Sequence, residues 1–438
     1  MAASEDRRQW RAAVVDLLQR DRLAQPDELG AVAAAAAAPL GLDVWVYLVD
    51  QEQRVLLPVP RPPAAPPPPL PVESTVAGQV FMTVRPRAST VDGRQRLWMP
   101  LLDGTERLGV LEFGLGDGGS ADDPGLLAGC DLFGQLLGHL VATKMPYGDA
   151  LLQVRRQRRM SEASELLWRL QPPMTFVSER AVVSAILEPC YEVGGDAFDY
   201  AANDGTLFFA IFDTAGHELR AGLGTAVVMS AIRAARRGGE GIAAMARAAD
   251  RALERHLPEL RFTTAVLAEL DLDSGRLRYV NAGHPPPLLI RRGRVVRGLD
   301  GGKRLPLGLG EAAGLSAAPG RGEAAGRGDA VVVGGDEVAE ELLERGDRLL
   351  LYTDGATEAV GRDGGVFGVE GLVELVERDT GELPAPEALR RLCHSALAGY
   401  AGTPADDVTL LLVEWAQDAA RRMLPLATAD PIPPWGEF

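Results

Sequence analysis

Short apolar runs separated by polar turns recur through the second half of the chain. Their length and their β-branched and aromatic residues are typical of strands, and two longer segments between them repeat apolar residues at helical spacing. The predicted strands are Leu207–Asp213, Thr263–Leu270, Leu277–Gly283, Asp347–Gly355 and Asp407–Trp415, and the predicted helices are Leu219–Arg237 and Ile242–His256. Strands in hairpin order with grouped helices indicate an α+β domain built on antiparallel sheets.

The first third of the chain also mixes helix and strand patterns. The predicted elements are a helix in Leu29–Pro39, a strand at Val44–Val49, two strands at Leu97–Leu102 and Leu108–Phe113, and a closing helix at Asp131–Ala142. Between them, Pro58–Pro71 cannot donate ladder hydrogen bonds and is predicted to be an extended loop. We interpret this loop as a spacer within a hairpin connection in preference to a docking motif.

The segment Ala150–Gln171 is polar and rich in arginine, and Pro172 follows it. Its pattern predicts one helix that joins the two halves of the chain and carries an apolar stripe. The stripe consists of Ala163, Leu166, Leu167 and Leu170. It would suit a homodimer seam. The basic run Arg155–Arg159 is interpreted as a solvated or dimer-flanking face in preference to a nucleic-acid site.

Composition is that of a globular protein with more than one core. The chain has 438 residues, 46% hydrophobic and 24% charged, with a net charge of −16 that disfavours nucleic acid and anionic lipid as partners. Its three cysteines lie far apart, its first residues are charged, and no run of about 18 apolar residues is expected. We therefore expect a soluble cytoplasmic protein that does not enter a membrane.

These patterns predict four parts of the chain. They are an N-terminal domain at residues 1–145, a helical linker at 146–174, a C-terminal domain at 175–415 and a weakly packed or mobile tail at 416–438.

Four aspartates stand at the ends of predicted strands or beside them. They are Asp196, Asp213, Asp354 and Asp406. Each alone could be a solvated turn residue or a helix cap. Together they indicate a hard divalent cation, because converging carboxylates repel each other and Mg²⁺ or Mn²⁺ relieves that repulsion through oxygen ligands. Glycines beside three of them, such as Gly195, Gly216 and Gly355, permit close backbone approach.

Six ordered blocks around these residues resemble the PP2C-like serine/threonine phosphatases of the SpoIIE/RsbU type. The blocks are EVGGDAFDY, FDTAGHELRAGLGTAVVMS, YVNAGHPPPLLI, LPLGLG, GDRLLLYTDGATEA and DDVTLLLVEW. The resemblance implies an αββα sandwich of two antiparallel sheets with two Mn²⁺ or Mg²⁺ ions at one edge. The first third, through STVAGQVFMTVRPR and LWMPLLDGTERLGVLEF, resembles a GAF domain, which implies a sensor for a small ligand or a partner.

The resemblance also implies roles for individual residues. Asp196 and Asp213 would hold and bridge the metals, the main-chain carbonyl of Thr214 would be a further ligand, and Asp354 and Asp406 would complete the set. The residues expected to support these ligands are Asp199, Gly216, His217 and Asp407. Asp406 and Asp407 could exchange roles, and His217 could equally be an ordinary turn residue. Asn281, Gly283 and His284 are interpreted as loop architecture.

One position departs from the family pattern. Relatives read D-x-x-G-H-G, whereas this chain has Glu218 in place of the last glycine. If that position requires positive φ, glutamate would strain the loop by about 1 kcal/mol or more. Because all four carboxylates remain, we expect catalysis to survive, weakened or more dependent on activation.

The implied activity is metal-dependent hydrolysis of phosphoserine or phosphothreonine. Two cations would lower the pKa of a bridging water and neutralise the phosphoryl oxygens during in-line attack. The implied substrate is a phosphorylated anti-sigma factor antagonist in a stress-response pathway, under the control of the N-terminal sensor. The alternatives are a pseudo-phosphatase that binds phosphoproteins without turnover and a scaffold that retains only the fold.

Overall fold

The computed structural model describes residues 2–91, 93–116, 119–188, 191–192, 194–216, 218–259, 262–309, 338–358, 367–379, 383–399, 406–417 and 423–425. Contacts divide the chain into two compact units, built mainly of Met1–Arg159 and of Met160–Met174 with Ser178–Gln417. The short helices Pro26–Glu28, Ala38–Leu40 and Met145–Tyr147 are of 3₁₀ type.

The N-terminal unit is an antiparallel sheet with helices on both faces. Its strands run in the order β3-β2-β1-β6-β5-β4. The strands are β1 Leu42–Val49, β2 Val55–Pro58, β3 Leu70–Pro71, β4 Arg87–Val91, β5 Arg94–Asp103 and β6 Glu106–Leu115, and the helices are α1 Ala2–Asp21, α2 Leu29–Ala37, α3 Val76–Thr83, α4 Pro124–Lys144 and α5 Ala150–Val154. The proline-rich loop connects β2 to its antiparallel partner β3, as predicted. The GAF-like assignment stays a prediction.

Helix α4 is longer and more apolar than the sequence pattern suggested. Phe133 and Leu137 on α4 are fully buried in the core of the unit, together with Val46 and Leu111 of the sheet. By length and hydropathy alone, the segment Pro124–Tyr147 could cross a membrane, and half of its apolar window is buried within the protein. The expectation that the described chain contains no such segment is wrong by this criterion, because alanine, glycine and leucine make the core helix almost free of charge.

The linker is not one continuous helix. Helix α5 ends at Val154, and a second helix, α6, starts at Glu162 and ends at Leu170. The Ser161 side chain accepts a hydrogen bond from Ser164 N and begins a new helix there. The basic run Arg155–Arg159 therefore lies in non-helical chain, and the predicted single helix is wrong.

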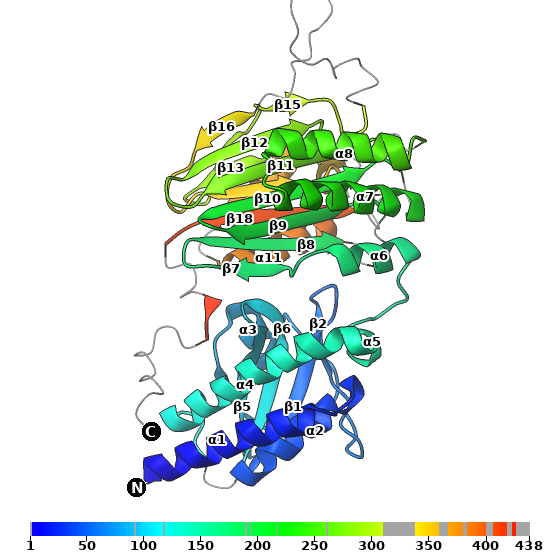
Figure 1. Cartoon of the computed structure of the whole chain (residues 1–438). Coiled ribbons are helices and arrows are strands. Elements are labelled where there is room, and N and C mark those ends of the chain that lie inside the picture. Colours follow the sequence, from blue (N-terminus) through cyan, green and yellow to red (C-terminus); the bar gives the residue numbers. More distant parts are fainter. Residues whose placement is uncertain are drawn as a thin grey trace, which may run out of the picture. The chain divides into compact units, whose positions relative to one another are not determined.

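The C-terminal unit is a sandwich of two sheets between helices, which confirms the predicted αββα architecture (Figure 1). One sheet runs β15-β12-β11-β10-β9 with β16 beside β12, and the other runs β14-β13-β17-β18-β8-β7. The strands are β7 Thr175–Val177, β8 Ala181–Glu188, β9 Ala197–Asn203, β10 Thr206–Thr214, β11 Thr263–Asp271, β12 Arg276–Ala282, β13 Leu288–Arg291, β14 Arg294–Gly298, β15 Lys303–Arg304, β16 Ala339–Leu342, β17 Arg348–Tyr352 and β18 Val408–Trp415.

Helices cover the outer face of each sheet. The helices are α7 Glu218–Arg237, α8 Ile242–His256, α9 Gly355–Glu358, α10 Gly368–Asp379 and α11 Ala385–Gly399. Buried side chains of α7 and α8, such as Ile232 and Met245, pack with Phe212 and Leu267 of the first sheet. Helix α11 contacts β8 and β18 of the second sheet.

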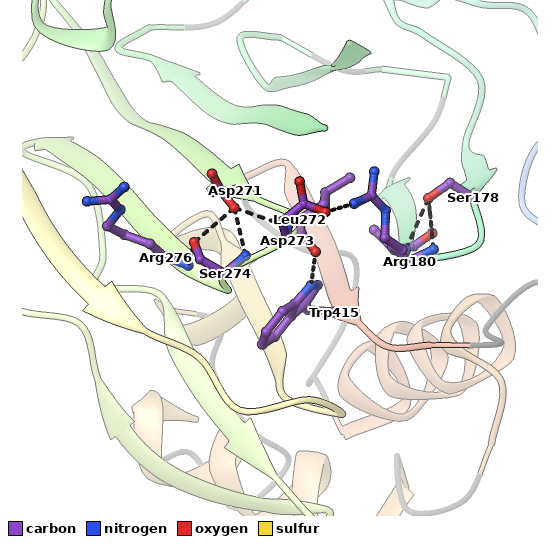
Figure 2. A network of polar contacts seen from close by, with 9 residues as sticks. Ser178, Arg180, Asp271, Leu272, Asp273, Ser274, Arg276 and Trp415 are labelled. Carbon is purple, nitrogen blue, oxygen red and sulfur yellow. Dashed lines mark hydrogen bonds and ion pairs between the residues drawn. The ribbon is translucent and has the colours of Figure 1, made fainter. Parts of the chain in front are cut away.

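One end of the sandwich is tied by a polar network (Figure 2). The Asp271 carboxylate accepts hydrogen bonds from Asp273 N, Ser274 N and Ser274 Oγ, which fixes the turn between β11 and β12. Trp415 at the end of β18 donates from Nε1 to the Leu272 carbonyl at 3.1 Å. These hydrogen bonds therefore hold the two sheets of the C-terminal unit together at this end.

The tail differs from the expectation where it is described. Met423 is 2% exposed, Pro425 is also buried, and the Arg85 guanidinium donates to the carbonyls of Leu424 and Pro425. These tail residues are therefore anchored and not weakly packed. Residues 426–438 lie outside the described part.

Candidate metal centre

Asp196 and Asp213 stand opposite each other on neighbouring strands. Strands β9 and β10 are antiparallel, with Ala197 paired to Phe212. Asp196 precedes Ala197 and Asp213 follows Phe212, so the register places the two aspartates across from one another at the same end of the sheet. Local hairpin pairing is therefore enough to bring these two predicted ligands together.

Asp354, Asp406 and Asp407 come from the second sheet at the same edge. Strands β17 and β18 are antiparallel with Tyr352 paired to Leu410, so Asp354 follows one strand where Asp406 and Asp407 precede the other. Thr353 joins the two sheets at this point. Its hydroxyl donates to Asp196 Oδ2 at 2.7 Å and accepts from Thr409 N at 2.9 Å. Thr353 was missed by sequence reasoning, although it directly precedes Asp354.

The pKa values of several of these carboxylates are raised by burial and by one another's charges. Burial, followed by repulsion from Asp354 and Asp406, raises the pKa of Asp213 to about 7. Burial and the charges of Asp407 and Asp213 raise the pKa of Asp196 well above its ordinary value. Burial also raises the pKa of Asp354, with Glu358 and Asp406 adding to the shift. The predicted acids therefore repel one another across a common space.

Asp407 holds the loop before β9 in place through hydrogen bonds from the loop's backbone. Its Oδ2 accepts from the backbone N–H groups of Gly194, Gly195 and Asp196 at 2.6, 3.0 and 3.4 Å. Asp407 is buried, whereas Asp406 is exposed. These contacts favour Asp406 as the carboxylate available to a cation and Asp407 as the residue that shapes the loop.

Two glycines keep backbone carbonyls uncovered at this edge. A Cβ on Gly195 would lie 2.5 Å from the Thr214 carbonyl oxygen, the expected main-chain ligand. A Cβ on Gly355 would lie 2.0 Å from the Asp407 carbonyl oxygen. The Thr214 hydroxyl itself is committed to Thr225 and Thr263, at 2.7 and 2.9 Å. Only the carbonyl of Thr214 therefore remains for a cation.

The donor set fits hard divalent cations. Four carboxylates and a carbonyl supply oxygen alone, which is the chemistry that Mg²⁺ and Mn²⁺ prefer, and the raised pKa values show repulsion that a cation would relieve. Within the described ranges, no three His, Cys, Asp or Glu side chains are grouped closely enough to hold an ion. The carboxylates converge but do not form a closed ligand shell.

Asp199 lies apart from this group. Its carboxylate pairs with Arg233 at 2.7 Å and Arg236 at 3.0 Å on α7. Arg233 also donates to the Leu170 carbonyl at the end of α6, at 2.7 Å. The side chain of Asp199 therefore ties β9 to the helices. Both arginines were missed, because their partner lies far away in the sequence.

The loop after Asp213 carries less strain than expected. Gly216 has φ +117°, which favours glycine, but Glu218 is already the first residue of α7 and is helical. The expected penalty at this position therefore does not arise, because a helical backbone does not have positive φ. His217 lies outside the described residues.

Asn281, Gly283 and His284 form a loop scaffold, in agreement with their interpretation. The Asn281 side chain bonds both N–H and carbonyl of His284 at 2.8 Å, and Gly283 has φ +69°. Burial lowers the pKa of His284 to about 3, so its ring is neutral near pH 7.

Gly355→Ala should damage both the fold and the site. The new methyl group would overlap the Asp407 carbonyl, and overpacking of this kind costs about 1–3 kcal/mol. Urea unfolding measures the loss. Gly241→Ala is the matched control, since a Cβ there meets nothing within 4 Å. Equal stability losses in the two variants would contradict the expected clash.

Stability without metal should fall as the pH rises. The pKa values of Asp213 and Asp407 are raised to about 7 and about 6, both by burial first. Between about pH 4 and pH 7 the folded protein thus binds more protons than the unfolded chain, so this contribution to stability is present below pH 4 and lost by pH 7. The gain in Tm on replacing EDTA by Mn²⁺ should therefore increase from pH 5 to pH 7.5. A gain that shrinks over this range would be inconsistent with repelling carboxylates.

Comparison with known proteins finds a family match for the C-terminal part of the chain. Residues 203–416 match the family model of Stage II sporulation protein E (SpoIIE). Similar solved structures include the RsbU and RsbW domains of a Mycobacterium tuberculosis protein, at 26% identity over 55% of this chain and 62% of that one, with a TM-score of 0.43. The SiaA PP2C domain of Pseudomonas aeruginosa shares 21% identity over 58% of this chain and 94% of its own, with a TM-score of 0.46.

The PP2C domain of SpoIIE from Bacillus subtilis, solved with a fragment of its regulatory domain, shares 17% identity over 55% of this chain and 65% of its own, with a TM-score of 0.40. The matched residues include Asp213, Asp354 and Asp406. Residues 203–416 of the C-terminal unit therefore resemble the SpoIIE family, and the chain spans less than two thirds of the RsbU and RsbW structure that it matches.

Proposed function

We propose that this chain is a metal-dependent protein serine/threonine phosphatase of the SpoIIE/RsbU type. Its substrate is a regulatory protein, an anti-sigma factor antagonist, which it dephosphorylates in the cytoplasm under the control of its N-terminal unit. The observation that carries metal dependence is the gathering of Asp196, Asp213, Asp354 and Asp406 at one edge of both sheets. Without a cation these four carboxylates repel one another, and the fold must hold them together against that repulsion.

The chain's own residues would hold and shape the site. Asp196, Asp213, Asp354, Asp406 and the Thr214 carbonyl would bind two Mn²⁺ or Mg²⁺ ions. When bound, such cations activate water and neutralise a phosphomonoester dianion. Asp407 holds the backbone of Gly194–Asp196 in place, and Thr353 orients Asp196. Hydrolysis by a water that the cations activate would need no covalent intermediate on the protein.

The substrate and the role of the N-terminal unit are supported by the family resemblance. Phosphorylated anti-sigma factor antagonists are the expected substrates of the SpoIIE/RsbU type. The chain contains a second unit with its own buried core, and a sensor would need such a unit. No kinase motif accompanies it, so a separate kinase would supply the phosphoprotein.

Activity assays with the full chain test this proposal. We expect hydrolysis of p-nitrophenyl phosphate and a phosphoserine peptide in Mn²⁺, and none in EDTA. Full activity in EDTA would refute metal dependence. Phosphoproteomics of cells lacking the protein would identify the substrate as an accumulating phosphoserine or phosphothreonine, and no change in antagonist phosphorylation would refute the proposed partner.

Calorimetry distinguishes the proposed phosphatase from the pseudo-phosphatase alternative. The observation in its favour is that, over the residues described, the acids do not close into a ligand group of three. A working centre should bind two Mn²⁺ ions per chain. Binding of at most one weak ion, with no turnover, would favour the alternative.

A further inference from the structure

Helix α7 is apolar on two faces, and the fold uses only one of them. The inward face buries residues such as Val228 and Ile232 against the sheet. On the outward face, Leu219 and Leu223 are 44% and 43% exposed. A helix on the surface of a globular protein usually presents polar residues to solvent. The apolar outward face of α7 is therefore not explained by packing within the unit.

This face borders a groove between α7 and α8, which lie side by side on the outside of the sandwich (Figure 1). The groove has a volume of about 560 Å³ and is lined by Leu223, Ala226, Val227 and Ser230 from α7 and by Ala252 and His256 from α8. Small side chains form much of the lining, and the groove is shallow and open to solvent. The groove can accept apolar side chains from outside.

A stripe of arginines runs along α8 beside this groove. Arg247, Arg251 and Arg255 are exposed and spaced four residues apart, which places them on one face of the helix. Arg251 and Arg255 form no ion pair with any residue that the structure describes. The chain as a whole carries a net charge of −16. A local basic stripe on such a protein would attract and orient an acidic partner that the rest of the surface repels.

The groove lies near the candidate centre. Helix α7 begins directly after the loop that follows Asp213, and Leu223 is five residues into the helix, about 8 Å along it. A segment bound in the groove could therefore belong to the same protein that places a phosphoryl group at the aspartates.

We propose that the α7–α8 groove docks the protein substrate, and that its occupant is an acidic amphipathic segment of the phosphoprotein. Apolar side chains of that segment enter the groove between Leu223 and His256, and its acidic residues face Arg251 and Arg255. The proposal rests on the proposed phosphatase function and adds the surface that selects the substrate. The exposed Arg251 and Arg255 favour an acidic segment as the occupant. A second copy of this chain, which is itself acidic, is an outcome that the test separates.

The test compares two phosphoserine peptides of equal length with the full chain. Both carry leucines at helical spacing, and one has glutamates where the other has lysines. The wild-type protein should show a KM about tenfold lower for the acidic peptide. Arg251→Glu/Arg255→Glu should reverse that preference, and Leu223→Ser should raise KM for the acidic peptide. Hydrolysis of p-nitrophenyl phosphate, which is too small to reach the groove, should be unchanged in all variants.

Arg276→Glu/Arg294→Glu provides the matched control, since both arginines are exposed and lie on strands outside the α7–α8 pair. It should leave the peptide preference intact. Equal KM values for both peptides, or a preference that survives Arg251→Glu/Arg255→Glu, would overturn the proposal. So would a wild-type dimer in light scattering that Leu223→Ser dissociates without changing peptide affinity. Fluorescence anisotropy measures peptide binding without turnover, so a failure of the phosphatase function itself would be seen separately.

Discussion

Asp213→Asn should abolish turnover and, in the same protein, stabilise the metal-free fold. Asp213 is the half-buried carboxylate whose pKa is raised to about 7 by burial and then by Asp354 and Asp406. Removing a ligand should lower kcat by more than about a hundredfold, since even residues that only orient a metal ligand contribute 10–100-fold. Without metal, the neutral amide removes a charge that its neighbours repel, so Tm in EDTA should rise.

The matched control is Asp204→Asn. Asp204 makes the turn that leads into β10 and has φ 47°, a backbone conformation that asparagine adopts readily. This control should keep both activity and the Tm gain with Mn²⁺. Assays with p-nitrophenyl phosphate and thermal unfolding in EDTA and Mn²⁺ give the two readouts. An Asp213→Asn protein that keeps its activity would remove Asp213 from the centre.

Asp406→Ala and Asp407→Ala should separate activity from stability. Asp407→Ala leaves three backbone N–H groups before β9 without their acceptor, two of them on buried residues, and each orphaned buried donor costs about 1–3 kcal/mol. We expect a loss of several kcal/mol in urea unfolding. Asp406 is exposed, and the one hydrogen bond it accepts among the described residues comes from its neighbour's N–H at 2.9 Å. Asp406→Ala should therefore unfold close to wild type.

For Mn²⁺ affinity, measured at low temperature where both variants are folded, we expect Asp406→Ala to be the more strongly affected variant. Asp406→Ala should weaken Mn²⁺ binding in calorimetry and lower kcat, while the stability remains. If Asp406→Ala binds Mn²⁺ as the wild type does, the two aspartates have the opposite roles, and Asp407 is the ligand.

The sequence was sufficient wherever the relevant interaction is local in the chain. Helix α8 matches its predicted range Ile242–His256, because apolar residues at helical spacing require only one face to be buried. The pairing of Asp196 with Asp213 follows from one hairpin. The sequence pattern wrongly predicted one helix over Ala150–Gln171. The helical spacing of apolar residues continues there through a break, and the hydrogen bond from Ser164 N to the Ser161 side chain begins a new helix.

The sequence therefore determined the candidate ligands, since hard cations favour carboxylate oxygens and the blocks that carry these aspartates keep a recognisable order. The tertiary structure determined which of two neighbouring aspartates is available to a cation and which one holds the backbone. Asp406 and Asp407 are chemically identical, and only the approach of Gly194 and Gly195 from the other sheet makes one of them a backbone clamp. Thr353 and Arg233 likewise depend on contacts between segments distant in the chain, which no local pattern encodes.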